Sequence, residues 1–60
     1  MTVREIQKII SKDGWYFSSQ QGSHRHYEHP IKKGKVTVPV HNGDLSKKTL
    51  NSILKQADLK

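Results

Sequence analysis

Two histidines, His24 and His26, follow a glycine turn in this chain, and their side-chain chemistry suits proton transfer. An imidazole has an unperturbed pKa of about 6.5, so it can accept or release a proton near neutral pH. Cleavage of RNA needs a base, an acid and charge stabilisation at the phosphate, because the RNA supplies its own 2′-hydroxyl nucleophile. We therefore expect His24 to act as a general base or acid, a role worth roughly 10²–10⁴-fold in rate. The alternative is a polar residue on a hydrated surface without a catalytic task.

The spacing of the two histidines gives His26 a candidate role of its own. Residues two apart on a strand share one face and lie about 6.5–7 Å apart. At that separation one imidazole can serve as the base and the other as an auxiliary acid across a scissile phosphate. The alternative is that His26 is incidental, since a two-residue spacing arises easily by chance.

Metal binding would be a competing use of these side chains, together with Glu28, His29 and His41. In a regular strand His29 points away from the face that carries His24 and His26, and the ligand spacings of structural zinc sites are missing. We therefore expect neither a metal nor another cofactor.

The chain carries a large excess of positive charge, with 11 Lys and Arg against 5 Asp and Glu and a formal net charge of +6. Such a field attracts polyanions, so nucleic acid is the first expected partner and an acidic protein the second. The alternative is a surface that only keeps the protein in solution. We expect His24 to stand on a positively charged sheet surface. Arg25 can bind a phosphate if its side chain reaches past the sheet edge. The lysines that we expect to attract the RNA backbone are Lys32, Lys33, Lys35, Lys47 and Lys48. Tyr16 is a candidate for stacking on an unpaired base, or an ordinary strand tyrosine.

The first element that must support these residues is a helix. Thr2 and Glu5 form a capping-box pattern at its start, and Gly14 is suited to end it. Apolar residues recur at helical spacing between them, at Val3, Ile6, Ile9 and Ile10.

Three short strands are predicted next, over residues 15–20, 24–29 and 35–40. Tyr27 is the only large apolar side chain of the second strand, so it should face the core, and alternation then turns His24 and His26 to solvent. Val40 is expected to face inward. Pro39 cannot donate a ladder hydrogen bond, which favours an edge position for the third strand.

The last element is an amphipathic helix that begins after Ser46, a good N-cap, with its apolar residues at Leu50, Ile53, Leu54 and Ala57. The order helix, three strands, helix predicts an α+β fold in one domain over residues 1–60, with both helices on one face of a three-stranded antiparallel sheet.

The composition indicates the cellular compartment of the protein. The chain has no cysteine, so nothing indicates an oxidising compartment. No apolar stretch approaches the roughly 18 residues of a membrane span, and the N-terminus lacks a signal-peptide core. We expect a cytoplasmic protein without membrane contact.

In the order of its helices and strands and in two sequence motifs, the chain resembles the HicA family of toxins. The matching residues are Gly22-Ser23-His24 with Tyr27, then Thr37-Val38-Pro39 with His41, then Leu50, Ile53, Leu54 and Ala57. The resemblance implies a fold like that of double-stranded-RNA-binding domains and a metal-free, mRNA-cleaving toxin that a HicB antitoxin neutralises. It also implies that His24 is the catalytic residue. The chain departs from the family pattern at Lys48 and Asp58, where glycines are common.

Two other classes of function stay open. A non-catalytic binder of double-stranded RNA would use helix and loop lysines, whereas a nuclease would use the sheet around His24. A pure protein-interaction module would neither bind RNA at physiological salt nor degrade it.

Overall fold

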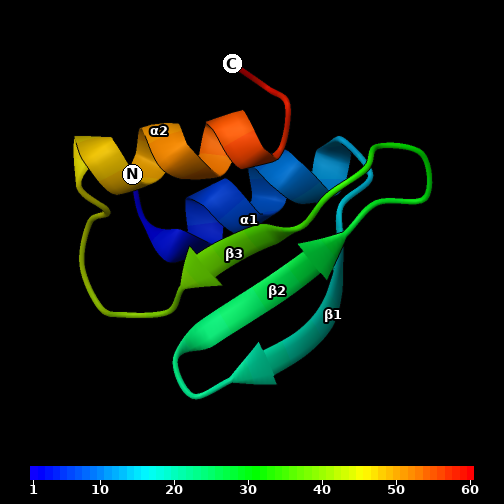
Figure 1. Ribbon diagram of the computed structural model, residues 1–60. Coiled ribbons are helices and arrows are strands. Elements are labelled where there is room, and N and C mark those ends of the chain that lie inside the picture. Colours follow the sequence, from blue (N-terminus) through cyan, green and yellow to red (C-terminus); the bar gives the residue numbers. More distant parts are fainter.

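The chain folds as a three-stranded sheet with two helices packed on one side (Figure 1). The computed structural model describes all residues, 1–60. The elements are α1 (Val3–Lys12), β1 (Tyr16–Gln21), β2 (His24–Glu28), β3 (Val36–Pro39) and α2 (Lys47–Gln56). The strands are antiparallel and lie in the order β1-β2-β3. The predicted α+β fold and its element order are confirmed.

Local sequence signals define both ends of α1. The backbone N–H of Thr2 donates to Glu5 Oε1 at 2.9 Å, and the N–H of Glu5 donates to Thr2 Oγ1 at 3.3 Å, which completes the predicted capping box. The bond from the Thr2 backbone holds the pKa of Glu5 below its ordinary value. Gly14 follows the helix with φ +106°, a conformation that favours glycine. A side chain there would also meet the ring of His29.

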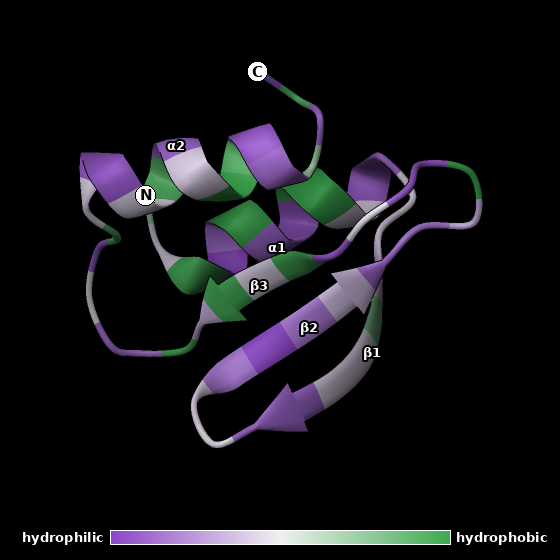
Figure 2. Cartoon of the chain, in the orientation of Figure 1, coloured by the Kyte–Doolittle hydropathy of each residue, from purple (hydrophilic) through white to green (hydrophobic).

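The core lies between the helices and the inner face of the sheet. Its buried residues, all apolar or aromatic, are Val3, Ile6, Ile10, Trp15, Tyr27, Val36, Val38, Leu45, Ile53 and Ala57. Figure 2 shows hydrophobic residues along both helices and β3, while most of β2 and the end of β1 are hydrophilic. Tyr27 faces the core as predicted, so alternation along β2 turns His24 to the other side.

Two details differ from the sequence-based expectations, the ends of β3 and of β2. β3 ends at Pro39, and Val40 is exposed rather than inward because the chain leaves the sheet there. β2 ends at Glu28, since His29 turns to accept hydrogen bonds from the following loop. Phe17 lies on the face of Tyr27 but is 48% exposed, because β1 is the strand farthest from the helices.

The outer edge of β3 has few backbone groups free to pair with another strand, because of a proline in β3 and a hydrogen bond from α2. Pro39 has no N–H, and the N–H of Thr37 donates to Gln56 Oε1 of α2 at 2.9 Å. The predicted edge position of this strand is confirmed.

Candidate functional site

His24 is the first residue of the central strand, directly after the turn that contains Gly22 with φ +58°. Its Cα pairs with Gln21 on β1 and with Pro39 on β3, so both neighbouring strands hold its backbone. Its side chain is exposed on the outer face of the sheet, which the helices leave open. The ring is therefore free to meet a large ligand, while its attachment point is fixed.

His26 shares the outer face and is held more tightly. It pairs with Ser19 and Thr37, and its Nδ1 lies 3.1 Å from Thr37 Oγ1. The ring is half-buried between its neighbours. Both imidazoles thus lie on one surface, two residues apart along β2, and the role of His26 as an acid stays a prediction.

Residues of β1 complete this outer face. A β-bulge between Phe17 and Ser19 inserts Ser18 as an extra residue, and its hydroxyl donates a hydrogen bond to Glu28 Oε2. Tyr16 pairs with Glu28 and is 52% exposed, so its ring is available to an unpaired base. The surface offers imidazole, hydroxyl and carboxylate groups.

The outer face carries none of the expected positive charge. Arg25 is the only Lys or Arg in the three strands, and it pairs with Val38 on the inner face. Its guanidinium stacks on Phe17, with Cζ 4.7 Å from the ring centroid, and its Nε is buried without a hydrogen-bond partner. The expectation of a positively charged sheet surface around His24 was wrong, because strand alternation sends Arg25 to the opposite side.

Lys32 joins the ends of two helices. Its ammonium donates to Asp13 Oδ2 at 2.5 Å and to the carbonyls of Ala57 and Asp58 at 3.2 and 3.4 Å. The bond from Lys32 holds the pKa of the Asp13 carboxyl below its ordinary value. Lys32 is therefore occupied within the protein.

His29 belongs to the same cluster. Its Nδ1 accepts the backbone N–H groups of Ile31 and Lys32 at 3.0 and 2.9 Å, so Nε2 carries the proton and donates to the carbonyl of Asp13 at 2.6 Å. Trp15 packs edge-on against this ring at 5.1 Å and donates its Nε1 proton to the carbonyl of Ala57. We call Asp13, Trp15, His29, Lys32 and Ala57 the closing cluster; it was not foreseen from the sequence.

The remaining predicted lysines divide between the two ends of the sheet. Lys33 and Lys35 lie in the loop between β2 and β3, at the opposite end of β2 from His24. Five residues of strand separate the two ends, about 13 Å. Lys47 and Lys48 begin α2 and lie exposed at the His24 end. Of the predicted lysines, only these two lie at the same end of the sheet as His24.

The segment from Val40 to Leu45 links this end of the sheet to the start of α1. Val40 donates its N–H to the carbonyl of Ser23 at 2.6 Å, and Leu45 donates to the carbonyl of Met1 at 2.7 Å. Thr2 and Asp44 form an isolated bridge. His41 lies in this segment, with Nδ1 2.9 Å from the carbonyl of Asn42. The family-like histidine after Pro39 is thus near the end of the sheet that His24 occupies.

Comparison with known families places this chain among the toxins of bacterial toxin–antitoxin systems. The family model that matches is described as the HicA toxin of bacterial toxin–antitoxin, and it covers residues 3–59. The chain belongs to the HicA toxin family, and membership implies an antitoxin as its partner. No curated protein matches the chain. Neither helix is long and apolar enough to cross a membrane.

One departure from the family pattern has a visible structural effect. α2 ends with Asp58 N–H bonded to the carbonyl of Lys55 and Leu59 N–H bonded to that of Leu54, the Schellman arrangement. This ending needs a left-handed residue after the cap, and Asp58 adopts φ 57°. The glycine that is common at this position in the family would adopt that conformation without strain.

Proposed function

We propose that this protein is an endoribonuclease that cleaves mRNA without a metal, with His24 as its catalytic residue. The observation that carries the proposal is the exposed imidazole at the start of the central strand, on the open face of the sheet. Because β1 and β3 both pair with this residue, the ring is presented from a fixed backbone, as a proton-transfer group requires. Membership of the HicA family supports the assignment. Since mRNA is the substrate, the site of action is the cytoplasm.

The reaction proposed is an internal transfer. His24 removes the proton of the 2′-hydroxyl, and the 2′-oxygen attacks the adjacent phosphorus. The bond from phosphorus to the 5′-oxygen breaks, and that oxygen takes up a proton. The products are a 2′,3′-cyclic phosphate and a free 5′-hydroxyl. His26 is the candidate acid that gives this proton to the 5′-oxygen, since it lies two residues from His24 on the same face.

The cognate antitoxin is proposed to be a HicB-type protein that covers the open face of the sheet. A partner seated there would block access to His24. The net charge of +6 favours an acidic surface on that partner.

The test is incubation of purified protein with a defined RNA in the presence of a chelator. We expect the wild type to cleave and His24→Ala to lose at least 10²-fold in rate. Gln21→Ala, which removes the side chain paired with His24, serves as the matched control and should keep most of the activity. If His24→Ala cleaves at the wild-type rate, the mechanism is wrong.

A second candidate function is supported by the distribution of charge. The strands contain one cation, Arg25, while the helices contain six. A non-catalytic module that binds double-stranded RNA through helix lysines would have such a distribution. In that case RNA would be bound but would stay intact, and protection mapping would locate it on the helices.

A further inference from the structure

Most of the Lys and Arg residues of this chain lie in the two helices and not in the strands. The six Lys and Arg residues within them are Arg4, Lys8 and Lys12 of α1 and Lys47, Lys48 and Lys55 of α2. Since the proposed catalytic histidine lies on a face without such residues, an RNA substrate needs another surface to hold its phosphates.

Three cations of α1 lie along one side of the helix. Arg4, Lys8 and Lys12 recur every four residues, so they share one exposed side of the helix and are separated by about 6 Å along its axis. None of them takes part in an ion pair; the two ion pairs of the structure join Met1 to Asp44 and Lys32 to Asp13. We call Arg4, Lys8 and Lys12 the α1 basic row.

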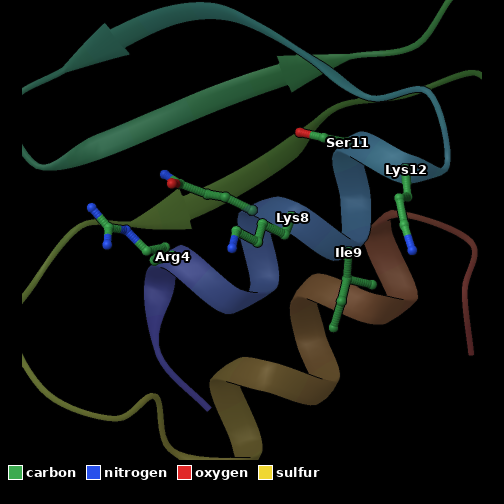
Figure 3. Close-up of a pocket in the computed structure, with 6 residues that line it drawn as sticks. Arg4, Lys8, Ile9, Ser11 and Lys12 are labelled. Atoms are coloured by element: carbon green, nitrogen blue, oxygen red, sulfur yellow. The ribbon is translucent and has the colours of Figure 1, made fainter.

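A shallow groove of about 640 Å³ lies along this row (Figure 3). Besides the three cations it is lined by Gln7, Ile9 and Ser11. Figure 3 shows the side chains of Arg4, Lys8 and Lys12 extending outward from α1. The lining thus combines three cations with two neutral hydrogen-bonding side chains and contains no carboxylate.

We propose that the α1 basic row is an anchoring surface for RNA, which binds phosphates of the strand that flanks the cleavage position. This inference rests on the proposed ribonuclease function and adds where the substrate is held. Lys and Arg supply the attraction, and polar side chains such as Gln7 and Ser11 supply hydrogen bonds to phosphate and sugar, which is the usual composition of a backbone-binding surface.

The composition of the groove favours RNA over the antitoxin as its occupant. The core of a protein–protein interface is depleted of charge and rich in large apolar or aromatic anchors. This groove offers one apolar side chain, Ile9, which is 37% exposed, among three free cations. A polyanion matches that surface better than a folded partner does.

The α1 basic row is connected to His24 through the end of the sheet. Arg4 lies in the first turn of α1, and the residues just before it bind the segment after β3, through the Leu45 to Met1 hydrogen bond and the Thr2–Asp44 bridge. That segment begins beside His24, where Val40 bonds to Ser23. The Arg4 end of the α1 basic row therefore lies at the same end of the sheet as His24, so a strand that continues past Arg4 passes toward the proposed catalytic residue.

The experiment compares two triple variants that remove the same charge. Arg4→Gln/Lys8→Gln/Lys12→Gln deletes the α1 basic row, and Asn51→Asp/Lys55→Gln/Lys60→Gln, at exposed positions with no assigned part in RNA binding, is the control; each lowers the net charge from +6 by three. Gln preserves helix propensity at these exposed positions, and circular dichroism confirms folding. Each triple variant is also combined with His24→Ala, so that binding of a labelled single-stranded RNA is measured without cleavage.

We expect the α1 triple to reduce the log–log salt slope of RNA binding by about 2, at about 0.7 per phosphate contact. Between 50 and 200 mM salt, the wild-type affinity should then fall about 20-fold further than that of the α1 triple. The control should keep the wild-type slope. With cleavage-competent protein, the α1 triple should raise KM for a long RNA and leave cleavage of a dinucleotide unchanged.

Equal slopes in the two triples would overturn the inference, because binding would then follow net charge alone. An α1 triple that binds RNA like the wild type while losing its antitoxin would also overturn it and identify a protein interface. Failure of the ribonuclease function is a separate result, seen as intact RNA with every variant, and the binding slopes with His24→Ala still test the anchoring surface.

Discussion

His24 and Arg25 are adjacent in the sequence, yet their side chains lie on opposite faces of the sheet. His24 faces the open surface, while Arg25 pairs with Val38 on the inner face and lies over Phe17. The nearest cation in the sequence is therefore separated from the proposed reaction by the sheet itself. Charge stabilisation at the phosphate therefore needs residues from outside the strands, and Lys47 and Lys48 at the start of α2 lie at the same end of the sheet as His24.

Substitution of Arg25 tests this separation. We expect Arg25→Ala to lower the free energy of unfolding by about 1–2 kcal/mol, since the stem and guanidinium cover an otherwise exposed aromatic ring. The effect on the RNA cleavage rate should be at least tenfold smaller than that of His24→Ala. Urea unfolding and single-turnover cleavage measure the two effects. A loss of cleavage as large as that of His24→Ala, in a folded protein, would show that Arg25 reaches the phosphate.

The ion pair between Asp13 and Lys32 predicts a pH-dependent stability. The hydrogen bond from Lys32 lowers the pKa of Asp13 from its ordinary value of 3.8. The unfolded chain therefore binds the proton at higher pH than the folded one, and stability rises with pH in this range. The contribution of the pair is complete above pH 4 to 5 and is lost as the pH falls through the lowered pKa.

Asp13→Asn should be less stable than the wild type at neutral pH, and the difference should shrink on acidification. Urea unfolding at several values between pH 2.5 and 6 measures it. Asp44→Asn is the control, because Asp44 pairs only with the N-terminus, at 3.7 Å. Parallel stability curves for wild type and Asp13→Asn would contradict the role of the pair.

The left-handed residue after α2 predicts a stabilising substitution. Asp58 adopts φ 57°, which costs an ordinary residue roughly 1 kcal/mol and glycine little. We expect Asp58→Gly to raise the free energy of unfolding by about 0.5–1 kcal/mol, and Asp58→Ala to lower it. Thermal or urea unfolding gives both values. If Asp58→Gly is no more stable than Asp58→Ala, the backbone conformation is not what limits this helix end.

The features that the sequence predicted correctly depend on neighbouring residues. The capping box of Thr2 and Glu5, the N-cap Ser46 and the ending at Gly14 are all local, and the structure has each of them. The orientation of Tyr27 followed from alternation. The same alternation places Arg25 on the inner face with Tyr27, which is why a phosphate contact requires its side chain to reach past the sheet edge.

The closing cluster could not be predicted in that way. Lys32 and Asp13 are 19 residues apart, and His29 meets the carbonyl of Asp13 over 16 residues. No periodic pattern relates such positions, and they meet only once the loop after β2 folds back over the end of α1. The extra residue Ser18 in β1 is another such case, since the polar run that contains it carries no glycine or proline to mark a bulge.

Both borders of the sheet are unsuitable for adding a strand from another molecule. On one border Pro39 lacks a donor and Gln56 already occupies the N–H of Thr37; on the other, the bulge at Ser18 breaks the regular ladder of β1. Irregular or occupied borders are how small β-proteins avoid edge-to-edge aggregation. A second copy of this chain, which has exposed aromatic rings on β1, is therefore hindered from pairing with either border, and the histidine face stays accessible.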